Sequence, residues 1–141
     1  MQDLTALASE LQLLNSRLRR RLREKATAGD FTPSQINVLL YLERQLTATV
    51  TELAQSEGVR TQSMGATVAT LQAAGMVAGQ PDPKDGRKTI LSLTEACRRK
   101  LQEGRAIRQH WLVHALRSLC ESEQAELAGA VRLLKRLVDH P

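Results

Sequence analysis

The sequence predicts a mainly α-helical protein that carries one small β-hairpin, and three observations lead to this fold class. Leucines near the N-terminus are spaced alternately by 3 and 4 residues, which is typical of an amphipathic helix with a heptad seam. Two short helical patterns are separated by Gly58, which predicts a helix-turn-helix. The turn dipeptide Asp85-Gly86 lies between two short extended runs, which predicts a hairpin. The 141 residues fit one domain.

The first helix carries the leucine seam Leu4, Leu7, Leu11, Leu14 and Leu18, continues into RLRRRLREK and is expected to end near Gly29. A long helix with a narrow apolar seam packs against another helix, in the same chain or in a second subunit. We interpret the basic block as the solvated side of this helix, with some members pairing acids across a dimer. Phosphate binding is the alternative for Arg17, Arg19, Arg20, Arg21, Arg23 and Lys25.

The second helix is predicted within FTPSQINVLLYLER. Thr32 is its expected N-cap, Pro33 suits the first helical position, and Gln35 completes a capping box. The helix is expected to end near Arg44. Its expected buried face is Ile36, Leu39, Leu40, Tyr41 and Leu42.

The helix-turn-helix is predicted in the next segment. Thr51 is expected to cap a helix of about two turns, Gly58 to end it in a left-handed conformation, and Val59 to enter the core. A second helix then begins at Arg60 or Thr61 and runs to about Ala74, burying Met64, Val68 and Leu71. Ala54 is small, which permits close approach of the two helices. A helix pair within a plain bundle is the alternative interpretation.

The hairpin comprises MVAGQ and TILSLT, joined by PDPKDGRK, in which two prolines exclude a helix. Thr94 is expected to cap a long helix that reaches about Leu119, and Ser122 to cap a last helix that reaches about Val138. The last helix carries a second seam at Leu127, Val131, Leu134 and Val138.

Charge and composition narrow the class of partner. The net charge is +5, and residues 60–100 hold seven basic and three acidic residues, so the excess lies around the helix-turn-helix and hairpin. A local basic surface favours a polyanion or an acidic partner. The chain has one Trp, one Tyr and one Phe, too few for single strands stacked on aromatic platforms. Duplex DNA is therefore the favoured partner.

A helix-turn-helix followed by a charged hairpin is a winged helix, and here the sequence resembles the MarR family of bacterial transcriptional regulators. The resemblance covers essentially the whole chain. It rests on ELAQ at 52–55, on LQAAGMV, on the wing residues Asp82, Pro83, Asp85 and Arg87, and on LSLT leading into a long helix. It implies one domain over 1–141, with a DNA-binding lobe at 30–94 and a helical dimerisation region at 1–29 and 95–141.

The resemblance implies a homodimeric repressor that binds a pseudo-palindromic operator, and the two leucine-rich seams favour the same assembly. An architectural DNA-bending protein without operator specificity is the alternative function, and a helical protein-interaction module is a further one that the wing argues against. No nucleophile elbow, phosphate loop or complete metal set is present, so we do not expect an enzyme.

The expected DNA contacts fall on the second helix of the motif and on the wing. Gln62 suits adenine and Ser63 suits several bases, while Arg60 and Thr61 lie where a helix N-terminus meets phosphate. Thr67 is a further expected contact. In the wing, the resemblance implies that Arg87 enters the minor groove and is held by Asp85. The full set is Arg60, Thr61, Gln62, Ser63, Thr67, Lys84, Asp85, Arg87 and Lys88.

A solvated polar helix face and a solvated turn with a local ion pair are the alternative interpretations of these residues. The chain also departs from the family in two places. Many members carry basic residues on the strand that enters the wing, where this chain has Ala78, Gly79 and Gln80. Many carry Arg near position 66, where this chain has Ala66. Both departures remove expected contacts with phosphates and bases. They therefore predict a modest affinity for DNA, or recognition of the operator more through its shape than through base contacts.

The resemblance also implies a small phenolic or aromatic acid as ligand, near the first half of the long helix. Trp111 is a candidate aromatic wall, and Arg105 or Arg108 a candidate partner for a carboxylate. Core or dimer-interface packing of Trp111 is the alternative, and the more favoured one.

The remaining candidates predict no cofactor and no metal. His110 and His114 have i, i+4 spacing but lack further ligands, so a surface or pocket pair is favoured over a metal site. Oxidant sensing is one interpretation of Cys97 and Cys120, and buried or inert thiols in a reducing cytoplasm are the favoured one. No apolar run approaches a membrane span, and no signal peptide is recognised.

Overall fold

A computed structural model of the chain describes residues 1–26 and 31–141, and its elements confirm the expected fold class. In chain order they are α1 (Leu4–Lys25), α2 (Pro33–Gln45), α3 (Val50–Glu57), α4 (Thr61–Ala73), β1 (Val77–Pro81), β2 (Thr89–Leu93), α5 (Glu95–Leu116) and α6 (Glu121–Val138).

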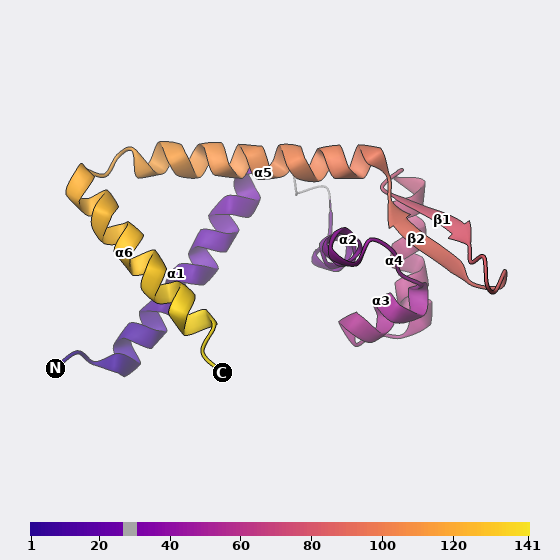
Figure 1. Ribbon diagram of the computed structural model, residues 1–141, viewed down its shortest axis with the longest axis horizontal. Coiled ribbons are helices and arrows are strands. Elements are labelled where there is room, and N and C mark those ends of the chain that lie inside the picture. Colours follow the sequence, from indigo (N-terminus) through magenta and orange to yellow (C-terminus); the bar gives the residue numbers. More distant parts are fainter. Residues whose placement is uncertain (27–30) are drawn as a thin grey trace.

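The molecule is elongated, and α5 runs along its length (Figure 1). The α2, α3, α4, β1 and β2 elements gather at one end of α5, and we call residues 31–94 the winged lobe (Figure 1). At the other end lie α1, α6 and the second half of α5, which we call the helical arm, together with both chain termini (Figure 1).

The winged lobe holds the hydrophobic core. The core consists of Val38, Leu39, Leu42, Ala48, Leu53, Ala54, Met64, Val68, Leu71, Val77, Leu91, Leu93 and Cys97. The expected inward face of α2 is partly wrong, because Leu40 is 42% exposed and Val38 is fully buried in its place. The helix is thus turned so that Val38, Leu39 and Leu42 face α4 and the hairpin.

Two predicted helix caps are confirmed and two are wrong. Thr32 and Gln35 form the capping box of α2, and Thr94 caps α5. The N-cap of α3 is Thr49 rather than Thr51. The N-cap of α6 is Cys120 rather than Ser122, because Glu123 bonds back to the amide of Cys120 and completes a capping box there.

The position of the α3 cap follows from a long-range backbone pairing. Ala48 N donates to Leu91 O at 3.1 Å, and Leu91 N donates to Ala48 O at 2.8 Å. This isolated bridge adds a third, one-residue strand to the β1–β2 hairpin, which is antiparallel with Val77 opposite Leu93 and Pro81 opposite Thr89. Because Ala48 is held extended against Leu91, the helix can begin immediately after Thr49.

The helical arm lacks a core of its own in the part of the chain that the structure describes. Neither α1 nor α6 has a buried residue. The seam leucines Leu4 and Leu14 are 74% and 60% exposed. The structure ends α1 at Lys25, and the predicted end at Gly29 and domain boundary at 29–30 lie outside the described residues. Among the described helices, none is long and apolar enough to cross a membrane.

Candidate nucleic-acid interface

The turn between α3 and α4 is built around a left-handed glycine. Gly58 has φ 67° and ψ 32°, and its N–H donates to carbonyls at the end of α3, as predicted for the C-terminal stop. The next amide, of Val59, donates to Ala54 O at 3.0 Å. The prediction that Val59 enters the core is wrong, because its side chain is 44% exposed on the outside of this turn.

The α4 helix buries one face and presents a small, polar one. Met64, Val68 and Leu71 are buried as predicted. Gln62 and Ser63 are exposed, whereas Thr67 is partly buried, with its hydroxyl donating to the Ser63 carbonyl at 3.3 Å. No charged residue occurs in α4, so a charged contact with phosphate at this helix must come from a flanking residue such as Arg60.

The N-terminus of α4 leaves backbone donors available. Arg60 is the N-cap residue and makes no side-chain capping bond, and the first helical hydrogen bond runs from Met64 N to Arg60 O at 3.0 Å. The amides of Thr61, Gln62 and Ser63 therefore precede the first intrahelical donor. Uncapped amides and the helix dipole together favour an anion at such an end.

The wing loop is ordered by two aspartates that bind backbone amides. Asp82 Oδ1 accepts from Lys84 N at 2.9 Å, and Asp85 Oδ1 accepts from Arg87 N at 3.1 Å. The loop closes with Lys88 N on Asp85 O at 3.0 Å and Asp82 N on Lys88 O at 2.9 Å. Asp85 thus fixes the backbone of Arg87, and no ion pair joins its carboxylate to the guanidinium among the described residues.

The wing and α4 lie side by side at the end of the molecule away from the helical arm (Figure 1). Arg60, Lys84, Arg87 and Lys88 are all exposed there. None of the four forms an ion pair with a described residue. The winged lobe thus carries an ordered loop with exposed cations and, on α4, an uncapped helix N-terminus.

Packing accounts for one departure from the family pattern. Gly79 lies on β1 opposite Leu91, next to α4. A Cβ at position 79 would lie 2.7 Å from Thr89 Cγ2 and 3.1 Å from Gln72 Nε2. A basic side chain at this point on the strand would therefore require neighbouring side chains to move.

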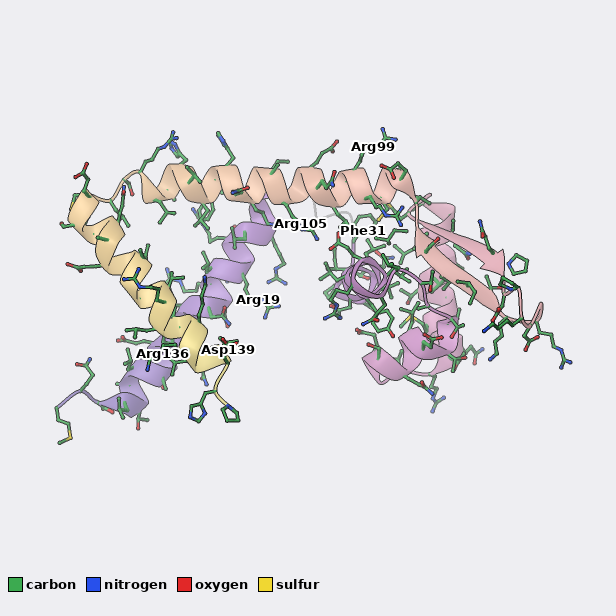
Figure 2. All side chains as sticks on the ribbon, viewed as in Figure 1. Arg19, Phe31, Arg99, Arg105, Arg136 and Asp139 are labelled. Carbon is green, nitrogen blue, oxygen red and sulfur yellow. The ribbon has the colours of Figure 1, made fainter. Side chains whose placement is uncertain are left out.

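Hydrogen bonds of Thr94 and Arg105 join the winged lobe to α5, and Cys97 of α5 lies in the core of the lobe. Thr94 Oγ1 donates to Gly75 O at 2.6 Å and accepts from Cys97 N at 3.1 Å, so one hydroxyl joins the end of α4 to the start of α5. Farther along α5, Arg105 Nη2 pairs with Glu43 Oε1 on α2. The hydrogen bond to Glu43 raises the pKa of Arg105, and burial opposes it only in part. In Figure 2, Arg105 lies on α5 between α1 and the winged lobe.

A cavity of about 380 Å³ lies where α1, α2 and α5 meet. Apolar side chains including Phe31, Ile36 and Leu101 line it together with four cations, Arg19, Arg23, Lys100 and Arg108. Two of the lining residues, Arg19 and Phe31, are labelled in Figure 2. The Nζ of Lys100 lies 4.8 Å from the Phe31 ring centroid.

Of the three predicted ligand residues, the structure brings only Arg108 to this cavity. Arg105 is engaged by Glu43 instead. Trp111 is half-buried beside α1, with Arg21 Cζ 5.6 Å and Lys25 Nζ 5.8 Å from its ring centroid. Sequence reasoning missed Arg19, Arg23 and Lys100, although the basic run in α1 was a visible signal for the first two.

The two thiols differ in environment. Cys97 is buried, and burial raises its pKa. Cys120 is exposed, so it is not the buried alternative of the expected buried or inert thiols. Hydrogen bonding to the Ser122 hydroxyl, 3.1 Å from Sγ, lowers the pKa of Cys120. His110 and His114 are exposed, and the described residues contain no cluster of three or more metal-ligating side chains.

A helix-turn-helix packed against an ordered, basic hairpin defines the winged helix-turn-helix class of DNA-binding proteins. Solved structures share this fold over nearly the whole chain. A putative transcriptional regulator from Pseudomonas aeruginosa is 35% identical and covers 97% of each chain with a TM-score of 0.81. A mutant of MepR from S. aureus, bound to an oligodeoxyribonucleotide, is 17% identical, with a TM-score of 0.75 over 93% of this chain and 97% of that one.

The sequence comparisons are more specific. Residues 29–88 match the MarR family. An uncharacterized HTH-type transcriptional regulator of Mycobacterium bovis is 36% identical over 133 residues, covering 94% of this chain and 93% of that protein. The chain therefore belongs to the MarR family of transcriptional regulators.

Proposed function

We propose that the protein is a homodimeric transcriptional repressor that binds a pseudo-palindromic operator. The proposal of a dimer rests on the amount of surface that a single chain exposes. The chain exposes 10876 Å², whereas a compact monomer of its mass, 15.6 kDa, is expected to expose about 7,200 Å². Part of the excess reflects the elongated shape, and α1 and α6 both expose large apolar side chains.

Those apolar side chains define the surface that a second copy would cover. We call this set the dimer seam, and it is made of Leu4, Leu7, Leu14 and Leu18 on α1 and Leu127, Val131, Leu134 and Val138 on α6, all of which are exposed. Stable dimers bury about 2,000–5,000 Å² in total through mainly apolar contacts. A two-fold pair would place two copies of α4 on successive turns of one face of the duplex, about 34–36 Å apart.

In this proposal α4 reads the major groove and the wing reads the minor groove. Gln62 and Ser63 lie on the exposed first turn of α4, where base edges come within reach. The amides at that end and Arg60 would hold phosphate. Arg87 would enter the minor groove, where a narrow groove concentrates negative potential. Lys84 and Lys88 would contact phosphates.

The cavity between α1, α2 and α5 supports a proposal for regulation. Its apolar wall and its cations, Arg19, Arg23, Lys100 and Arg108, suit a small aromatic acid whose carboxylate pairs with a guanidinium. Such a ligand would relieve repression only by binding one lobe orientation more tightly than the other. We expect a coupling of about 1–3 kcal/mol.

Selection of bound duplexes from fragmented genomic DNA tests this function. A regulator recovers a preferred, two-fold related sequence, and titration of phenolic acids against that sequence then tests the ligand. Recovery of no preferred sequence would favour an architectural DNA-bending protein. If a preferred operator is recovered but no phenolic acid changes its binding, the regulator role stands and only the ligand-sensing role is excluded.

A further inference from the structure

Beyond the residues that would touch DNA, we propose that Glu43 and Arg105 are positioning residues that set which operator half-site spacing the protein accepts. This inference rests on the proposed dimer and its two-fold operator. It assigns a specificity role to an ion pair that lies outside the basic surface of α4 and the wing.

The geometry of the α5 attachment leads to this inference. Thr94 is the point at which α5 leaves the winged lobe, and its hydroxyl holds the end of α4 through Gly75 O. Cys97, one turn farther along α5, lies in the core of the lobe, and Leu101 packs against that core. The stretch of α5 from Thr94 to Leu101 is therefore the base at which the helix is held to the lobe, and a change of orientation between the lobe and the rest of α5 is a rotation about this base.

The Glu43–Arg105 pair restrains that rotation. Arg105 is eleven residues beyond Thr94, about 16 Å along α5 at ~1.5 Å rise per residue. Its partner belongs to α2, whose buried face packs on α4 and β2. A bond to Arg105, one turn beyond the end of this base, resists the rotation more effectively than a bond within the base.

The same pair is a polar link across this junction, in addition to the core contacts of Cys97 and Leu101. Among the described residues, the other ion pair on α5 joins Arg98 to Glu95, at 3.9 Å within the helix itself. α2 is also tied to α3, since Asn37 Nδ2 donates to Glu57 Oε2 at 3.1 Å. Holding α2 to α5 therefore holds the helix-turn-helix to the arm that forms the proposed dimer.

In the proposed dimer, lobe rotation changes the separation of the two α4 helices. Adding one base pair between half-sites moves them apart by about 3.4 Å and rotates one by about 35°. A restrained lobe tolerates such a change poorly, and a lobe released at Arg105 tolerates it better. The pair thus contributes discrimination between spacings, with little effect on recognition of a single half-site.

The test uses the selected operator and duplexes with one base pair added or removed between half-sites. Affinities of the wild-type chain, Glu43→Gln and Arg105→Gln are measured at one fixed salt concentration. A partly exposed ion pair is worth at most about fivefold in an equilibrium. We therefore expect the preference for the native spacing to fall about threefold to fivefold in both variants, while affinity for an isolated half-site duplex stays within about twofold.

Two further variants separate positioning from structural damage. The charge exchange Glu43→Arg with Arg105→Glu is expected to restore the spacing preference, because the pair is re-formed in reverse. Glu95→Gln is the matched control, because it removes the ion pair within α5, and it is expected to leave the preference unchanged. Dimer mass and urea midpoint are measured for every variant.

The outcomes are distinct. If Glu43→Gln and Arg105→Gln weaken all duplexes equally, including the isolated half-site, or leave the spacing preference intact, the positioning role is refuted. The same holds if the charge exchange fails to restore a preference that both single variants lose. If the wild-type chain shows no preferred sequence or spacing, the proposed function itself fails.

Discussion

At the scale of single residues, the DNA contacts proposed for the wing are of two kinds. Arg87 is held at the tip of an ordered loop by the bond from its amide to Asp85, whereas Lys84 lies on the approach to the tip. Arg87→Ala is expected to weaken binding mainly on operators with a narrow minor groove. Lys84→Ala is expected to weaken binding equally on all sequences, and to reduce the salt slope by about one per protomer.

Fluorescence anisotropy over a salt series, on operators that differ in minor-groove width, measures both effects. Unchanged affinity of Arg87→Ala on every sequence would show that the wing does not contact DNA as proposed. If Lys84→Ala weakened binding on some sequences more than on others, the Lys84 side chain would do more than bind phosphate.

Cys120 and Cys97 are expected to differ sharply in reactivity. Because the Ser122 hydroxyl lowers the pKa of exposed Cys120, its thiolate forms at lower pH than that of an ordinary thiol, and reaction with a thiol reagent follows the thiolate. Cys97, with its pKa raised by burial, should react only on unfolding. The folded protein should therefore consume one equivalent of reagent.

A pH series of the reaction rate checks this assignment, and Ser122→Ala is the informative variant. Loss of the hydroxyl removes the main stabilisation of the thiolate, so the pH of half-maximal rate should rise. A pH profile that does not move would assign the lowered pKa to another cause.

At the scale of elements, the Thr94 hydroxyl makes two interactions, the cap of α5 and the bond to Gly75 O, and one substitution removes both. Thr94→Val loses the α5 cap and leaves Gly75 O without its donor, and we expect a loss of about 1–2 kcal/mol in the free energy of unfolding. Thr94→Ser retains the hydroxyl and should retain most of the stability. Urea unfolding measures both variants, and equal stability of Thr94→Val and wild type would contradict this account.

The same scale shows why sequence reasoning located most elements and missed some of their ends. Local signals sufficed for the Thr32 capping box, for the Gly58 stop and for the buried stripe of α4. The start of α3 depends on Ala48 pairing with Leu91, 43 positions away, and nothing local chooses Thr49 over Thr51. The rotation of α2 that buries Val38 instead of Leu40 depends on packing in the same way.

The same contrast between local sequence patterns and distant contacts applies to the candidate site. Exposed residues on α4 and the wing could be named from helical spacing and turn chemistry, because those patterns are local. Arg105 and Trp111 were candidates for a ligand pocket that the family resemblance implies near this part of the long helix, and packing was the favoured alternative for Trp111. Their actual partners, Glu43 on α2 and Arg21 on α1, come from distant segments that only the tertiary structure brings together.

At the scale of the whole molecule, the dimer seam should be necessary for assembly. The double variant Val131→Lys with Leu134→Lys places two charges within it, and each apolar side chain lost from an interface costs about 1.5–3 kcal/mol. We expect sedimentation to give the monomer mass of 15.6 kDa, where wild type gives about twice that. Ala125→Lys lies on the opposite face of α6 and should remain dimeric.

A dimeric double variant would contradict the assignment of the seam. A monomeric wild-type chain at micromolar concentration would contradict the proposed assembly altogether.

The absence of buried residues in α1 and α6 also links folding to protein abundance. If the two helices are covered only by a second copy, part of each chain's stability is supplied by its partner and declines by mass action on dilution. The melting temperature should then rise with protein concentration, as it does for other coupled folding and association reactions. In a cell, the number of copies synthesised would itself decide how much of the protein is competent to occupy its target.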